Sequence, residues 1–173
     1  MIVKLVVENF KSFLEAVTVD FTAGTTSRLS GNLLRHQNGE RFVKSMAVYG
    51  PNAAGKTTIL DGLYALREFV LFSSKDQKPT ARIPRFEAFA LDKSSSKHPT
   101  RIALTVDLDG DRYTLDVSAT NRQVWKETLE IKRTAKQPGR KATGQLLIER
   151  NWVPAKNKFV TQLHEDLGTE LTR

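Results

Sequence analysis

The order of hydrophobic and polar residues predicts a β-rich chain with one long helix. Ile2–Val7 is almost wholly apolar and β-branched, and Ala16–Phe21 alternates, so these two segments are expected to form a β-hairpin. Apolar residues then recur at helical spacing, which predicts a helix over Gly55–Phe72. Met46–Tyr49 comes just before this helix, and its short apolar run predicts a buried strand.

The second half of the chain predicts consecutive antiparallel strands joined by turns. The expected strands are Arg85–Leu91, Arg101–Leu108, Arg112–Ser118, Gln123–Arg133 and Gln145–Trp152. Asp109-Gly110-Asp111 predicts a tight hairpin turn, and Thr134–Thr143 is expected to be a second turn. Thr22–Glu40 is interpreted as a loop with at most one short helical turn, and Ser73–Pro84 as a linker. Phe159–Leu171 has weak helical character.

One motif carries the clearest chemistry. Gly50–Thr57 reads G-x-x-x-x-G-K-T and matches the phosphate-binding P-loop at every fixed position. A glycine turn with a solvated lysine is the simpler alternative. The expected strand before the motif and the expected helix after it favour nucleotide binding, because that is the context in which a P-loop works.

The residue types in this motif suit a triphosphate with Mg²⁺. Gly50 and Gly55 allow backbone conformations closed to other residues, so that the intervening amides can converge on phosphate at the start of a helix. Lys56 is the expected catalytic residue, reaching the β- and γ-phosphates, and the Thr57 hydroxyl is the expected magnesium ligand. Thr58 is a further possible donor to the α-phosphate. The expected ATP-binding residues of the loop are Gly50, Asn52, Ala53, Ala54, Gly55, Lys56, Thr57 and Thr58.

Composition narrows the class of protein. The chain has 173 residues, of which 39% are hydrophobic and 27% charged, as expected for one globular domain or part of one. It has no cysteine, which excludes disulfides, thiolate metal sites and a cysteine nucleophile. The sequence shows neither a signal peptide nor an apolar run of membrane-spanning length, so a cytoplasmic location without a membrane partner is expected.

The charge is strongly basic and unevenly distributed. The chain carries a net charge of +8. Residues 122–158 contain ten Lys and Arg against three Glu, a net of +7. This excess favours an anionic partner, and DNA is the first candidate. A solvated basic face is the equally weighted alternative.

The opening residues carry a family resemblance. The first expected strand ends in Asn9-Phe10-Lys11-Ser12-Phe13, and such an Asn-Phe-Lys/Arg-Ser turn a few tens of residues before a P-loop is characteristic of ABC-type ATPase heads. The chain resembles the RecF and SMC group of these heads, which includes OLD-like and anti-phage AAA ATPases. Phe86–Leu91 and the hairpin around Asp109 look like the antiparallel lobe of that group. The resemblance implies that Lys11 and Ser12 lie near the bound nucleotide.

The resemblance implies a mixed α/β (α+β) P-loop NTPase fold of ABC-ATPase type. Residues 1–72 would supply the β-hairpin, the P-loop strand and the helix, and residues 85–155 the antiparallel β lobe. The glutamine loop, the Leu-Ser-Gly-Gly signature, the Walker B Asp-Glu pair and the switch histidine of the group are missing. Arg28–Asn32 and Ile102–Asp107 imitate two of these motifs, but the first precedes the P-loop and the second is better explained as an alternating strand.

The expected function follows from this combination. Residues 1–173 are predicted to be one incomplete ATPase domain of DNA repair or anti-phage defence that binds ATP and dimerises with nucleotide. Hydrolysis is expected only with a complementing C-terminal lobe, because it needs a second carboxylate and a positioned water. A small P-loop phosphotransferase and a non-catalytic nucleotide-dependent interaction module are the alternatives. The three histidines are expected in loops or solvent, and Trp125 and Trp152 in cross-strand packing.

Overall fold

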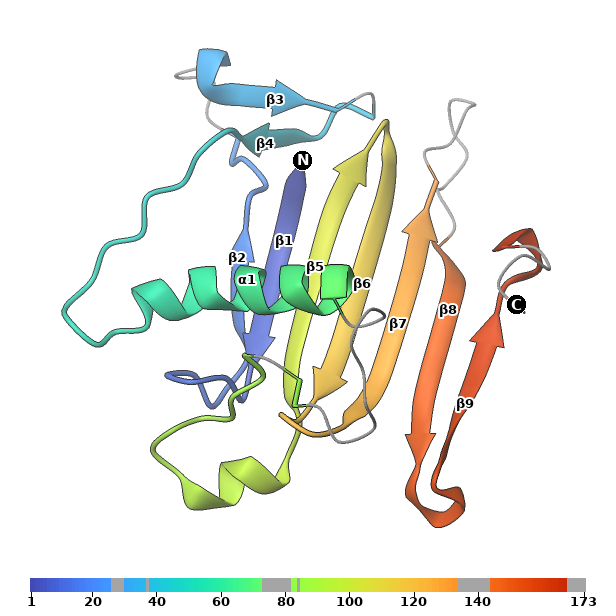
Figure 1. Ribbon diagram of the computed structural model, residues 1–173. Helices are drawn as coiled ribbons and strands as arrows, with labels where there is room; N and C mark the ends of the chain where they lie inside the picture. Colours follow the sequence, from blue (N-terminus) through green and yellow to red (C-terminus); the bar gives the residue numbers. More distant parts are fainter. Residues whose placement is uncertain (26–29, 37, 73–81, 84, 134–143, 168–173) are drawn as a thin grey trace.

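Seven antiparallel strands form a single sheet with one α-helix packed across it (Figure 1). The computed structural model describes residues 1–25, 30–36, 38–72, 82–83, 85–133 and 144–167. The strand order is β2-β1-β5-β6-β7-β8-β9. Strands that are neighbours in this sheet are also consecutive along the chain, except that β5 lies beside β1. The strands are β1 Ile2–Glu8, β2 Val17–Asp20, β5 Thr100–Leu108, β6 Asp111–Ala119, β7 Val124–Lys132, β8 Gly144–Val153 and β9 Lys158–Leu163.

Most of the expected strands are confirmed. β1 and β2 form the predicted hairpin, and β5 to β8 form the predicted meander. Asp109 and Gly110 make the tight turn between β5 and β6, with φ of 52° and 92°. β1 also pairs with β5, so the opening hairpin and the meander belong to one sheet. The expected turn at 134–143 and most of the expected linker at 73–84 lie outside the described residues.

The predicted helix is confirmed as α1 Lys56–Phe72. Its buried face carries Gly62, Ala65, Leu66 and Phe69 at helical spacing. Gly62 is the point of closest approach, since a Cβ built there would lie 2.7 Å from Val7 Cγ1 of β1. The core between helix and sheet comprises Leu5, Val7, Phe10, Ala65, Leu66, Phe69, Ile83, Phe86, Ile102, Val117, Ala119 and Val124. No helix among the described ranges is long and apolar enough to cross a membrane.

The predicted buried strand at Met46–Tyr49 is wrong. This segment runs as an irregular loop from β4 to α1 (Figure 1). Met46 and Val48 are 44% and 46% exposed, and Tyr49 is 90% exposed. A strand is stable only when a neighbouring strand satisfies its amides and carbonyls. Within the described residues, positions 45–49 make no backbone hydrogen bond, so the apolar pattern alone does not produce a strand.

The predicted strand at Arg85–Leu91 is also wrong. Arg85 has a φ of 65°, which is incompatible with an extended strand. The segment instead bonds to the Asn9–Phe13 turn, where the Lys11 amide donates to the Glu87 carbonyl at 3.1 Å and the Ala90 amide donates to the Lys11 carbonyl at 2.8 Å. It then enters the 3-10 helix η2 Lys93–Lys97, which Asp92 caps. The side chain of Phe86 is buried in the core.

The predicted weak helical character of Phe159–Leu171 is wrong for residues 159–163, which lie in β9, whereas residues 165–167 do form a short 3-10 turn. A short turn, η3 Pro154–Lys156, reverses the chain after β8, and Asn157 completes the turn with a φ of 49°. β9 then pairs antiparallel with β8, followed by η4 Glu165–Leu167. Sheet pairing satisfies the backbone here, and Phe159 packs against Trp152 with ring centroids 5.1 Å apart. The expected cross-strand packing of Trp152 is thus confirmed.

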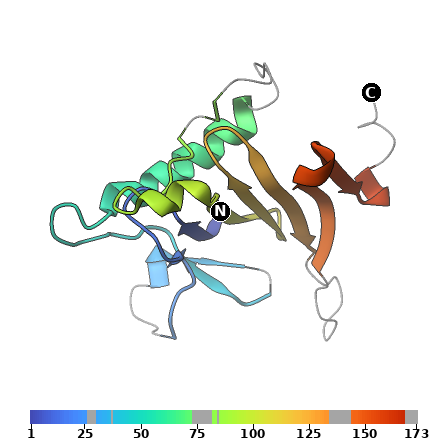
Figure 2. The same cartoon turned by 90° about the horizontal axis from the view of Figure 1, so that it is seen from below.

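The expected loop at Thr22–Glu40 contains more structure than predicted. It holds the short helical turn η1 Ser30–Asn32 and the strand β3 Leu33–Arg35. β3 pairs with β4 Arg41–Val43 to form a small second sheet. Figure 2 shows this hairpin on the side of the large sheet that faces away from α1. Phe42 anchors the hairpin with its buried ring.

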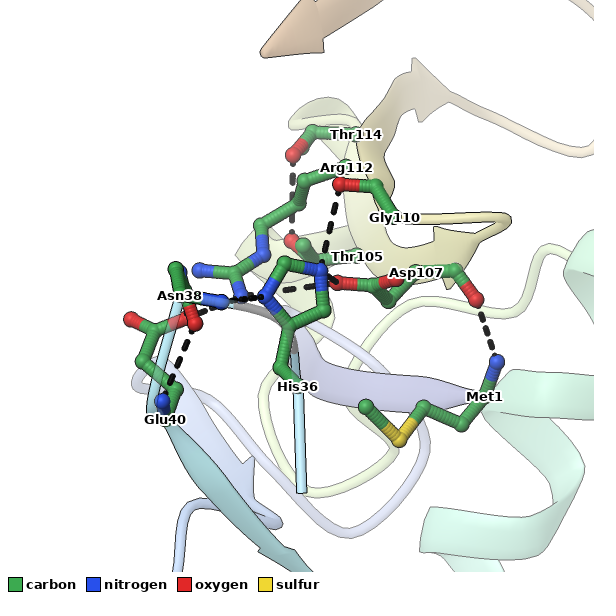
Figure 3. Close-up of polar contacts among 9 residues, drawn as sticks. All are labelled: Met1, His36, Asn38, Glu40, Thr105, Asp107, Gly110, Arg112 and Thr114. Atoms are coloured by element: carbon green, nitrogen blue, oxygen red, sulfur yellow. Dashed lines mark hydrogen bonds and ion pairs between the residues drawn. The ribbon is translucent and has the colours of Figure 1, made fainter. Parts of the chain in front are cut away.

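A polar network joins this hairpin to the tip of the large sheet (Figure 3). His36 Nε2 lies 3.1 Å from Asp107 Oδ2 and 3.1 Å from the Gly110 carbonyl, and both side chains of the His36–Asp107 pair are 5% exposed. His36 thus lies in a loop, between β3 and β4, as one of the two predicted alternatives had it, but its side chain is not exposed to solvent. The Asn38 amide donates to His36 Nδ1 at 3.2 Å.

Arg112 extends the network to a second carboxylate. It forms an ion pair with Glu40, lies 3.6 Å from Asp107, and stacks over the Phe42 ring at 5.6 Å. The hydrogen bond from Arg112 lowers the pKa of Glu40, and the same bond raises the pKa of Arg112. The amino group of Met1 donates to the Asp107 carbonyl. The network fixes the hairpin just before the chain enters the phosphate loop.

Candidate nucleotide-binding site

The phosphate loop lies between the exposed segment 45–49 and the first turn of α1. The Ala54 amide donates to the Pro51 carbonyl at 3.3 Å, closing a tight turn. Gly55 has a φ of 86° and Ala53 a φ of 64°, so these two residues take the left-handed conformation. Gly50 does not: its φ is not positive, and a Cβ there would only touch Ala54 Cβ at 3.6 Å. The special conformation expected of both glycines is therefore found at Gly55 alone.

The loop offers free donors to an anion. Residues 50–54 are exposed, and the amides of Ala53 and Gly55 have no acceptor among the described residues. The first three amides of α1, those of Lys56, Thr57 and Thr58, lack intrahelical acceptors by geometry, whereas the Ile59 amide donates to the Gly55 carbonyl at 3.3 Å. Together with the positive end of the helix dipole, they make a site for phosphate oxygens.

The Lys56 side chain is folded back onto this loop. Its Nζ donates to the Gly50 carbonyl at 2.8 Å and to the Pro51 carbonyl at 2.6 Å. The ammonium therefore lies over the same turn that presents the free amides. The next residue, Thr57, is exposed, whereas Thr58 is 5% exposed. The Thr58 hydroxyl lies 3.0 Å from Ser12 Oγ.

The Asn9–Phe13 turn packs against α1 directly after the loop. Lys11 Nζ donates to Asp61 Oδ2 at 2.7 Å, and both side chains are about one-quarter exposed. The structure thus brings Lys11 and Ser12 to the first two turns of α1. Asp61, which holds Lys11, is a residue that sequence reasoning missed. No local sequence signal connects Asp61 with Lys11, because the two residues are 50 positions apart.

Asn9 fixes the other side of this turn. Its Nδ2 donates to the carbonyls of Ser95 and His98, each at 3.0 Å, and its Oδ1 accepts from the Phe89 amide at 3.2 Å. The Thr100 hydroxyl donates to the Asn9 carbonyl at 2.8 Å. Asn9 is 6% exposed with a φ of 47°, and asparagine tolerates this conformation better than most residues. The turn is therefore braced between α1 and the segment 86–100.

The strand that imitates a Walker B motif leads elsewhere. Asp107 is the next-to-last residue of β5 and lies beside the β3–β4 hairpin, where its Oδ2 is 3.1 Å from His36 Nε2 and 3.6 Å from Arg112. Among the residues described, no group of three or more His, Asp or Glu side chains could hold a metal ion. The Thr57 hydroxyl, which the sequence predicts as a magnesium ligand, is exposed at the start of α1.

Comparison with known families decides the class of this site. A family described as AAA domain matches residues 4–167, which include the Asn9–Phe13 turn, the phosphate loop, α1 and all of the sheet except the first two residues of β1. The chain belongs to the AAA domain family. It is an ATP-binding, AAA-type P-loop ATPase domain, and the predicted P-loop NTPase class is confirmed. No curated protein matches the chain.

Proposed function

We propose that this AAA domain is the ATP-binding lobe of an ABC-type ATPase head of the RecF and SMC group, acting in DNA repair or anti-phage defence. The observation that carries the proposal is the contact between the Asn9–Phe13 turn and the P-loop helix, through Lys11–Asp61 and Ser12–Thr58. The sequence resemblance rests on the same turn and loop. Membership of the AAA domain family supports the ATP-binding part of the proposal.

ATP binding would rest on main-chain donors and one ammonium. The free amides of the loop and of the α1 terminus would bind phosphate oxygens. Lys56 would exchange the Gly50 and Pro51 carbonyls for phosphate, a short movement within the same loop. The exposed Thr57 hydroxyl is a suitable ligand for Mg²⁺. When bound, Mg²⁺ would neutralise part of the negative charge of the phosphates.

Hydrolysis needs groups from beyond this lobe. A catalytic carboxylate must orient water next to the γ-phosphate. Of the carboxylates discussed, Asp61 is bound by Lys11 and Asp107 by His36 and Arg112. Neither is positioned as a base in the phosphate loop. The proposed lobe therefore holds and orients ATP, and a complementing lobe supplies the hydrolytic group.

The exposed apolar surface beside the loop supports a complementing lobe. Tyr49 is 90% exposed, and α1 presents Leu60 and Tyr64 to solvent at 56% and 55%. α1 is thus apolar on its outer side as well as on its core side, a pattern typical of a helix covered on both sides. We propose that the C-terminal part of the ATPase covers this face and pairs with the unbonded segment 45–49.

Equilibrium titration with fluorescent ATP and Mg²⁺ tests the binding step. Lys56→Ala is expected to weaken binding by at least about 30-fold, because it removes the charge that partners the phosphates. Lys44→Ala is the matched control, since Lys44 bonds to the Gly31 carbonyl. Equal affinity of wild type and Lys56→Ala would remove the proposal.

Phosphate release and light scattering test the division of labour. The 173-residue chain is expected to bind ATP without turnover, and a version extended by a complementing lobe is expected to hydrolyse ATP and to dimerise with nucleotide. Multiple turnovers by the chain alone would contradict the assignment of the hydrolytic group.

DNA contact through residues 122–158 is a further part of the proposal. Its support is the local net charge of +7, a count that already includes the two glutamates paired across strands: Lys126 lies 3.3 Å from Glu149, and Arg150 lies 2.6 Å from Glu127. Binding to duplex DNA is expected to weaken steeply with added salt. Absence of binding at low salt would identify the segment as a solvated basic face.

A further inference from the structure

Phe13 lies against the one glycine of the phosphate loop that has a left-handed backbone. A Cβ built on Gly55 would lie 2.5 Å from Phe13 Cζ and 2.6 Å from Phe13 Cε1. The ring edge thus occupies the place where a side chain at position 55 would be. Gly55 is buried, although residues 50–54 are exposed. Two separate constraints therefore favour glycine at position 55: the backbone φ of 86°, and the Phe13 ring, which leaves no room for a side chain.

This contact is the last of a row along α1. The consecutive residues Lys11, Ser12 and Phe13 meet Asp61, Thr58 and Gly55. Asp61 and Thr58 are three residues apart and are neighbours on the helix surface, and Gly55 comes three residues before Thr58, directly ahead of the first residue of α1. The two polar contacts fix the register of the turn along α1. They place the Phe13 ring at the junction between loop and helix.

The turn that carries Phe13 is itself rigid. The amides of Phe10 and Phe13 each donate to the carbonyl of the other residue, at 2.7 Å and 2.8 Å. Phe10 is fully buried in the core, and Asn9 is bonded to the segment 89–100. A ring mounted on such a turn cannot move away from Gly55 without breaking several of these contacts. The loop-to-helix junction therefore receives its support from the turn.

We propose that Phe13 is a positioning residue for the triphosphate. The ring confines Gly55 to the left-handed conformation, and so orients the peptide whose N–H belongs to Lys56, the first residue of α1. Phe13 has no donor and acts on phosphate only through Gly55. The inference rests on the proposed function, since the loop must bind phosphate. It predicts that phosphate binding, rather than recognition of the base, depends on the ring.

The test compares Phe13→Ala, Phe13→Leu and Leu14→Ala in titrations with fluorescent ATP and with inorganic tripolyphosphate, both with Mg²⁺. The Ala and Leu variants at position 13 are expected to bind both ligands about tenfold more weakly. Leucine keeps an apolar side chain but ends short of Gly55, so thermal unfolding of Phe13→Leu should stay near that of wild type. Leu14→Ala, the adjacent exposed position, should bind as wild type does.

A double-mutant cycle with Gly55→Ala isolates the ring contact. The loss of affinity caused by Gly55→Ala should be smaller in the Phe13→Ala background, because the added methyl group no longer meets the ring. Additive losses would overturn the proposal, as would wild-type affinity in both Phe13 variants. Lys56→Ala distinguishes failure of the Phe13 proposal from failure of the proposed function. If Lys56→Ala also binds ATP with wild-type affinity, the assignment of the phosphate site itself is wrong.

Discussion

The two ends of the phosphate loop lie in opposite surroundings. At the end that enters α1, Gly55 is buried under Phe13, and Lys11 and Ser12 hold the helix through Asp61 and Thr58. At the other end, residues 45–49 make no backbone hydrogen bond among the described ranges, and Tyr49 is 90% exposed. The motif is continuous in sequence, but within the described part of the chain only its helical end is supported by contacts with other segments. An apolar pattern therefore predicts burial only if a partner surface exists.

The largest expected effect comes from replacing Phe10, in the turn that supports the helical end of the loop, and comparing it with replacement of Tyr49 at the open end. Phe10→Ala should lower the free energy of unfolding by about 3–5 kcal/mol, because it empties a fully buried site in the core. Tyr49→Ala should change it by less than about 0.5 kcal/mol, because the ring is exposed. Urea unfolding of both variants measures the difference. A loss above about 1 kcal/mol for Tyr49→Ala would show that the open end is packed after all.

Gly62→Ala probes how tightly the supported end is packed. A methyl group there would lie 2.7 Å from Val7 Cγ1, and overpacking costs about 1–3 kcal/mol. The better helix propensity of alanine offsets about 1 kcal/mol of this cost, so a net loss of up to about 2 kcal/mol is expected in thermal or urea unfolding. Gly24→Ala is the control, since nothing lies within 4 Å of a Cβ at that position. Adding Val7→Ala should relieve part of the Gly62→Ala loss. Fully additive losses would contradict the contact.

The Lys11–Asp61 pair should contribute less than the packing. Both side chains are about one-quarter exposed, and such pairs contribute up to about 1 kcal/mol. A double-mutant cycle with Lys11→Met and Asp61→Asn should give a coupling of about 0.5–1 kcal/mol that decreases in high salt. A coupling near zero at low salt would mean that Ser12 and Phe13 alone hold the turn against the helix.

The smallest expected effect is a pH dependence in the β3–β4 hairpin, which leads into the open end. Arg112 and then Asn38 hold the pKa of Glu40 below its ordinary value of 4.5. A carboxylate with a depressed folded pKa stabilises the protein fully above its unfolded pKa, and this stabilisation is lost as the pH falls through the folded pKa. Glu40→Gln should therefore cost about 0.5 kcal/mol near neutral pH, an amount that allows for solvent screening.

Thermal unfolding of wild type and Glu40→Gln between pH 3 and 7 measures this loss. The difference between the two proteins should disappear in the acid part of that range, and Glu15→Gln, at an exposed position, serves as the control. A constant difference at every pH would assign the effect to packing instead of charge.

Local sequence patterns predicted the elements whose contacts are local. The β1–β2 hairpin, the turn at Asp109 and Gly110, and α1 follow from alternation, turn residues and helical spacing. The failures are segments whose conformation depends on distant partners. Arg85–Leu91 reads as a strand but bonds to the Asn9–Phe13 turn, and Phe159–Leu163 reads as helical but completes the sheet beside β8.

The candidate site divides in the same way. The motif identified positions 50–58, and the resemblance pointed to Lys11 and Ser12. No local pattern pointed to Asp61 as the partner of Lys11, or to Phe13 as the ring over Gly55. Those contacts join residues about 40 to 50 positions apart, and a sequence pattern cannot specify which of many distant side chains will meet.

The sequence alone determined the chemistry of this protein: a glycine-bounded loop, one lysine and one hydroxyl at the start of a helix, which fits the P-loop ATPase class of the AAA domain family. Tertiary structure alone decided which parts of that loop are held in place, and that His36 is buried beside Asp107. The physical reason is that spacing along a chain fixes which groups can face the same side of one element. Whether a loop is held in place, and whether a side chain is buried, depends instead on which other segments of the chain pack against that element.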